Sequence, residues 1–74
     1  MFTRFDFLGD PAGPLQALRG DGWDLEGEAD RAVRGTHPEV PDEAAARCRL
    51  DRLGLLTSRS LLIRFHHSRR APGN

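Results

Sequence analysis

Hydrophobic and polar residues alternate along three short stretches of the chain, which is the pattern of half-buried strands. These stretches are TRFDFL at 3–8, WDLEGEAD at 23–30 and SRSLLIRFHH at 58–67. In the first stretch Phe5 and Phe7 share one side, so the other side should face solvent. The predicted outward positions of the three stretches include Arg4, Asp6, Glu26, Arg64 and His66.

Two further stretches have the residue spacing of helices. The first, PLQALRG at 14–20, begins with a proline, which suits a first helical turn, and ends at a glycine. The second runs from Asp42, the expected N-cap, to Leu53. In this second stretch Ala46 and Leu50 lie on one side. Each helix therefore has an apolar side that can cover a sheet.

Residues 24–35 fit either a helix or a hairpin. On a helix Leu25, Ala29 and Val33 would share an apolar side, but an interior Gly27 would cost about 1 kcal/mol. A two-stranded sheet would be weak support for three helices, whereas a hairpin provides four strands. We therefore expect an α+β fold of order β-α-β-β-α-β, a small split (ferredoxin-like) sandwich with a four-stranded antiparallel sheet and two helices on one face. The alternative is β-α-α-α-β.

The hairpin allows two registers around a loop of three residues. One register pairs Asp24 with Arg34, and a shift by one pairs Glu26 with Arg34. In both registers Arg34 faces a carboxylate. Such a loop favours one residue in the left-handed conformation, and here that residue would have to be Ala29 or Asp30.

The length of 74 residues suits one small domain, which we place at 1–68, followed by a flexible tail at 69–74. A core this small favours stabilisation by self-association, so we expect a homodimer. Cys48 is the only cysteine, and no stretch has the apolar core of a signal peptide or membrane span, so we expect a cytoplasmic protein. All eleven basic residues are Arg, a bias typical of a GC-rich bacterial genome.

Charge is divided unevenly between the two halves of the chain. Residues 1–43 hold four arginines against ten acids, whereas residues 44–74 hold seven arginines against Asp51 alone. The net charges are therefore −6 and +6. Either the halves complement each other, within one chain or across a dimer, or the basic half binds an anionic partner such as nucleic acid.

The middle stretch predicts an acidic face made of Asp24, Glu26, Glu28 and Asp30. On a strand these carboxylates would repeat about every 6.6 to 6.8 Å. That spacing is wide for Ca²⁺ or Mg²⁺, whose ligands converge at about 2 to 2.6 Å from the metal. We expect this face to be solvated and to pair with arginines.

The soft metal ligands of the chain are His37, Cys48, His66 and His67. They show no C-x-x-C or H-x-x-x-H spacing, and the adjacent His66 and His67 would point to opposite faces of a strand. No phosphate-loop, dinucleotide or Gly-x-Ser-x-Gly motif is present. We therefore expect no metal, no cofactor and no catalytic residue.

These observations favour a small non-catalytic binding or regulatory module that acts through association with a protein, itself included. The candidate partner-binding residues are Arg47, Arg49, Arg52, Arg59, Arg64 and His66. One alternative is a nucleic-acid-binding protein that uses the Arg-rich C-terminal half. Against it, the three arginines of 47–52 ring their helix, and no aromatic residue is predicted outward for base stacking. A second alternative is a small enzyme or accessory subunit whose site forms between subunits.

Overall fold

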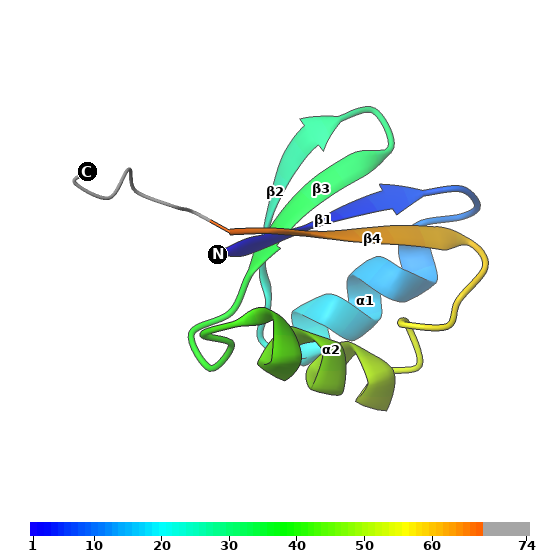
Figure 1. The fold of residues 1–74 in the computed structure, drawn as a ribbon. Coiled ribbons are helices and arrows are strands. Elements are labelled where there is room, and N and C mark those ends of the chain that lie inside the picture. Colours follow the sequence, from blue (N-terminus) through cyan, green and yellow to red (C-terminus); the bar gives the residue numbers. More distant parts are fainter. Residues whose placement is uncertain (68–74) are drawn as a thin grey trace.

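The computed structural model describes residues 1–67, and its elements follow the order β-α-β-β-α-β. They are β1 (Phe2–Phe7), α1 (Ala12–Gly20), β2 (Asp24–Ala29), β3 (Ala32–Thr36), α2 (Glu43–Arg52) and β4 (Leu61–His66). The strands form one antiparallel sheet in the order β2-β3-β1-β4. Both helices lie on the same side of this sheet (Figure 1). The predicted α+β class, with four antiparallel strands and two helices, is confirmed. The predicted tail at 69–74 lies outside the described residues.

The middle of the chain is a hairpin, so the alternative order β-α-α-α-β is wrong. Of the two predicted registers, the one that pairs Glu26 with Arg34 is confirmed and the one that pairs Asp24 with Arg34 is wrong. The physical reason is a bulge: the pairing shifts between Gly27 and Ala29, which leaves Glu28 as an extra residue on β2.

The predicted three-residue loop is wrong as well, because the bulge shortens the turn to Asp30 and Arg31. No residue other than glycine has a positive φ in the described chain, so neither candidate for a left-handed turn residue adopts that conformation. The Arg31 side chain donates hydrogen bonds to the backbone carbonyls of Phe7 and Gly9. The turn is thereby attached to the end of β1.

The first strand begins one residue earlier than the alternation predicted, at Phe2. Alternation then places Phe2 on the same side as Arg4 and Asp6, while Thr3 and Phe5 face the helices and are fully buried. The prediction that no aromatic residue occupies an outward position is therefore wrong.

Residues in and next to the first and last turns explain where the two helices begin and end. Helix α1 starts two residues before Pro14, which then occupies the first turn, where its missing N–H has no partner to lose. Helix α2 starts as predicted, because the Asp42 side chain accepts a hydrogen bond from the Ala45 N–H at 2.9 Å. Beyond α2, Gly54 has a φ of 76°, a left-handed conformation that ends the helix.

The core lies between the helices and the sheet. Its main buried members are Phe5, Phe7, Leu18, Trp23, Val40, Ala46, Leu50, Leu55 and Leu61. Phe5 and Trp23 meet edge to face, with ring centroids 5.8 Å apart. Gly35 makes this contact possible, because a Cβ at that position would lie 2.7 Å from Phe5 Cε2. With the helices committed to this core, the opposite side of the sheet is left uncovered in the described chain (Figure 1).

Candidate functional site

The uncovered side of the sheet is the main candidate site, and we call it the open face. The pairing registers place on it Asp24, Glu26, Ala29, Ala32, Arg34, Thr36, Phe2, Arg4, Asp6, Leu62, Arg64 and His66, and hydrogen bonds from Arg34 and Arg4 place the bulged Glu28 there as well. All four strands contribute to this face, so residues far apart in the sequence become neighbours. It brings together three of the four acids of the predicted acidic face with two of the predicted partner-binding residues, Arg64 and His66.

One row of residues crosses the open face from edge to edge. Glu26 on β2 lies opposite Arg34 on β3, which lies opposite Arg4 on β1, which lies opposite Arg64 on β4. Three neighbouring guanidinium groups in one row repel one another and destabilise the sheet. The row therefore needs carboxylates close by.

Glu28 supplies the carboxylate at the centre of the row. Its side chain accepts a hydrogen bond from Arg34 Nε at 3.1 Å and another from Arg4 at 3.4 Å. Arg4 Nε also donates to Asp6 at 3.2 Å. Because the bulge aims Glu28 across β3, two arginines and two carboxylates form a neutral network at the centre of the open face.

Phe2 lies beside this network and has both of its ring faces covered. His66, from β4, stacks on the ring with centroids 4.7 Å apart and planes 6° from parallel. From β3, the Arg34 guanidinium lies 4.4 Å from the ring centroid. Phe2 was not predicted on this face, because the alternation of the sequence placed the start of the strand at Thr3. With neighbours on either side, the ring has no free face on which a base could stack.

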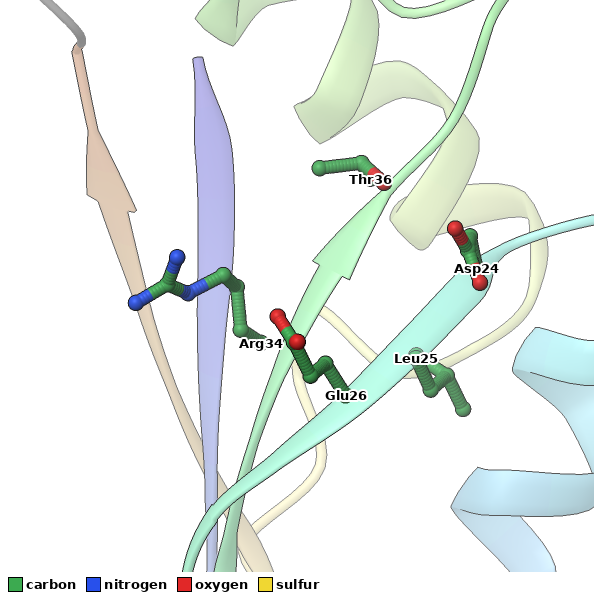
Figure 2. Close-up of a pocket in the computed structure, with 5 residues that line it drawn as sticks. All are labelled: Asp24, Leu25, Glu26, Arg34 and Thr36. Carbon is green, nitrogen blue, oxygen red and sulfur yellow. The ribbon is translucent and has the colours of Figure 1, made fainter.

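The two edges of the open face carry opposite charges. On β2 stand the carboxylates of Asp24 and Glu26, and on β4 stands the guanidinium of Arg64, next to the imidazole of His66. Figure 2 shows Arg34 turned away from Glu26 and toward β1, in agreement with its contacts to Glu28 and Phe2. Within residues 1–67 no ion pair joins the charged edge residues Asp24, Glu26 and Arg64 to any other side chain.

A shallow, open hollow lies at the acidic edge (Figure 2). Its lining consists of Asp24, Leu25, Glu26, Arg34 and Thr36. Leu25 points away from the other four and packs against the core, so the hollow is bounded on its open side by polar groups. Two carboxylates without ion pairs in the described chain therefore border one depression, which suits a cationic group.

The remaining predicted partner-binding residues do not join this face. Arg47 and Arg49 lie on α2, on the other side of the sheet, and already pair with carboxylates: Arg47 with Glu43 at 2.9 Å, and Arg49 with Asp21 at 2.8 Å and with Glu39 at 3.0 Å. Arg52 ends α2, and Arg59 lies in the connection to β4; both are exposed. Asp30, from the predicted acidic face, lies in the hairpin turn. The structure thus divides these candidates among separate places.

Asp21 holds several of these elements together. Its Oδ2 accepts hydrogen bonds from Trp23 Nε1 at 3.0 Å and from Arg49 Nε at 2.8 Å, and its backbone carbonyl lies 2.8 Å from His37 Nε2. Burial acts to raise the pKa of Asp21, but the hydrogen bonds from Arg49 and Trp23 outweigh it and hold the pKa below its ordinary value. This cluster has a structural explanation, because it links the end of α1 to β2 and α2.

The soft metal ligands are scattered. His37 is engaged with Asp21, His67 lies 3.2 Å from Glu43, and Cys48 is exposed on α2. Among the residues that the structure describes, no group of three or more His, Cys, Asp and Glu side chains is placed to hold a metal ion. In the same part of the chain, no helix has the length and apolar character needed to cross a membrane.

Comparison with known proteins gives no relative from which a function could be transferred: no family model, curated protein or solved structure matches the chain. The open face is therefore the feature of the protein that points to a function.

Proposed function

We propose that the protein is a small binding module without catalysis, and that it associates with a protein through the open face. The observation that carries this proposal is the organisation of that face. Helices cover one side of the sheet, and the other side holds a fixed network of four charged side chains between two edges of opposite charge. Such an arrangement determines the orientation in which a partner binds, because only a surface with the complementary charge pattern fits it.

Apolar groups at one end of the open face support the same proposal. Leu8 and Leu62 are the large hydrophobic side chains that the described chain leaves most exposed, at 60% and 46%. Both belong to the same end of the β1–β4 pair, where the Leu8 N–H donates to the Ser60 carbonyl at 2.8 Å. Apolar side chains beside ordered charged groups are typical of protein interaction surfaces.

Binding of nucleic acid is less well supported by the same face. Its four carboxylates, Asp6, Asp24, Glu26 and Glu28, outnumber its three arginines, and two of those arginines are already paired. The ring of Phe2 is covered on both sides. A phosphate backbone would meet repulsion and a base would find no stacking platform.

Photo-crosslinking tests the proposal. A photoreactive phenylalanine derivative replaces Leu62 on the open face in one variant and Cys48, exposed on α2, in a control variant. After irradiation in an extract of the native host, we expect a protein adduct for the variant at 62 and not for the control. Unlabelled wild-type protein should suppress this adduct, and the variant Leu62→Asp should not.

Three results would overturn the proposal. The first is an equal yield of adducts at positions 62 and 48, and the second is the absence of an adduct at position 62. The third is an adduct at position 62 that is removed by nuclease and not by protease. The last of these would favour nucleic acid as the partner.

A further inference from the structure

The proposed function leaves open which protein covers the open face, and the charge pattern of that face identifies a candidate. The β2 edge is acidic and the β4 edge is basic, while the centre between them is neutral. A face with opposite charges at its two edges is complementary to a copy of itself that has been turned over.

Only one kind of two-fold axis brings the opposite edges together. An axis parallel to the strands places β2 of each copy over β4 of the other, at the same level along the strands. An axis perpendicular to the strands, in the plane of the interface, would place β2 over β2, and carboxylates would then face carboxylates. Aligned packing of two sheets, with strands within about 30° of each other, is a common arrangement.

We infer that the open face binds the open face of a second copy about a two-fold axis parallel to the strands, so that Arg64 of each copy enters the acidic hollow of the other. This inference rests on the proposed function. Arg64 and Glu26 end the same row of residues, so the axis superposes them. Each has no ion pair within residues 1–67, and the hollow beside Glu26 is open to solvent. The Arg64 guanidinium of one copy thus meets the Glu26 carboxylate of the other.

The neighbouring rows are complementary under the same axis. His66 is two residues from Arg64 and comes over Asp24 of the second copy, and Leu62 comes over the exposed Ala29. At the centre Arg4 and Arg34 face each other across the axis, but Glu28 and Asp6 already neutralise them. No row of the sheet therefore opposes this arrangement.

The interface is small, and this sets the conditions of the experiment. Four strands about 4.8 Å apart and about six residues long present a face of roughly 15 by 20 Å. Interfaces of this size belong to weak complexes, so we expect micromolar rather than nanomolar affinity. The mass of the full chain should be measured by sedimentation equilibrium from the micromolar to the millimolar range.

The test uses two charge reversals, Glu26→Arg and Arg64→Glu. Each variant alone places like charges in both contacts of the dimer, so we expect its dissociation constant to rise about tenfold or more. An equimolar mixture of the two variants restores opposite charges in the mixed dimer. In the mixed dimer, the arginine introduced at position 26 of one chain faces the glutamate introduced at position 64 of the other. The second contact keeps its native pair, so the mixture should dimerise about as tightly as the wild type.

The control reversals Asp51→Arg and Arg52→Glu, exposed on α2, should leave the dimer unchanged.

The outcomes separate this inference from the proposed function. A wild-type protein that stays monomeric overturns the inference, whereas an adduct at position 62 with a different protein would still support the proposed function. A dimer that resists both reversals, or variants that weaken it and are not rescued by mixing, overturns the arrangement. Far-ultraviolet circular dichroism confirms that each chain is folded. If Glu26→Arg is not folded, Glu26→Gln replaces it, and an unchanged dissociation constant for Glu26→Gln contradicts the contact.

Discussion

Arg49 Nε donates a hydrogen bond to Asp21 Oδ2 at 2.8 Å and so joins two residues that are 28 positions apart in the sequence. Arg49 lies near the end of α2, and Asp21 is the C-cap of α1. The same carboxylate oxygen accepts a hydrogen bond from the indole N–H of Trp23, a core residue that immediately precedes β2. One carboxylate thus links two helices to a strand, and its ionisation should be coupled to folding.

The variant Asp21→Asn tests this coupling. The pKa of Asp21 is lowered in the folded state, so its carboxylate stabilises the fold above its ordinary pKa, and that contribution is lost as the pH falls through the folded value. We expect Asp21→Asn to be less stable than the wild type at pH 7, and the difference to shrink below about pH 4. Urea unfolding at a series of pH values measures it.

Two matched variants separate Asp21 from other acids. Asp51→Asn, at an exposed position on α2, should follow the wild type at every pH. Glu43→Gln should remove another part of the acid sensitivity, since hydrogen bonds from Arg47 and His67 lower the pKa of Glu43. A pH-independent difference between Asp21→Asn and the wild type would contradict the role assigned to ionised Asp21.

Gly35 should not tolerate a side chain. An added Cβ would lie 2.7 Å from Phe5 Cε2, 3.1 Å from Trp23 Cε3 and 3.2 Å from Leu25 Cδ2. We expect Gly35→Ala to lower the free energy of unfolding by about 1 to 3 kcal/mol, the usual cost of overpacking a core. The control Gly27→Ala has no atom within 4 Å of its Cβ and should raise stability by about 0.5 kcal/mol. Equal effects of the two substitutions in urea unfolding would contradict this account of the core.

We expect the hydroxyl group of the buried residue Thr3 to lower the stability of the fold. It is fully buried, and its Oγ1 has no hydrogen-bond partner in the described chain. Replacing it by Val removes an unsatisfied polar group at nearly constant volume, so Thr3→Val should stabilise the fold by about 1 kcal/mol. The matched substitution Thr36→Val, at an exposed position, should change stability by less than about 0.5 kcal/mol. A loss of stability in Thr3→Val would show that the hydroxyl group has a partner after all.

The elements of the fold were predictable where a local rule decides them. Alternation predicted the first and last strands of the chain, and the N-cap at Asp42 predicted the start of α2. The hairpin followed from the need for more than two strands. Two registers were left open, and the one that pairs Glu26 with Arg34 is observed, but the bulge at Glu28 and the two-residue turn were not predicted. Nothing in the sequence alternation marks where a bulge falls, since Glu28 fits the pattern of an ordinary strand residue.

The open face was only partly predictable for a related reason. Several outward positions were identified, including Arg64 and His66, whereas Phe2 was missed, and the order of these positions across the face depends on strand order and register. Arg47 and Arg49 were grouped with Arg64 because all are basic and close in sequence. The partners of Arg49 on neighbouring loops, Asp21 and Glu39, become visible only when the chain is folded, whereas Arg47 pairs with Glu43 one turn earlier on α2.

The central claim is that two copies meet through their open faces with β2 of one over β4 of the other. Two variants test it most directly: Glu26→Cys and Arg64→Cys, each carrying Cys48→Ser so that the new thiol is the only one. A short bis-maleimide reagent should link Glu26→Cys to Arg64→Cys in an equimolar mixture. It should link neither variant to itself, because like positions lie at opposite edges. Self-linking as efficient as the mixed reaction, or no mixed product at concentrations where the wild type is dimeric, would contradict the claim.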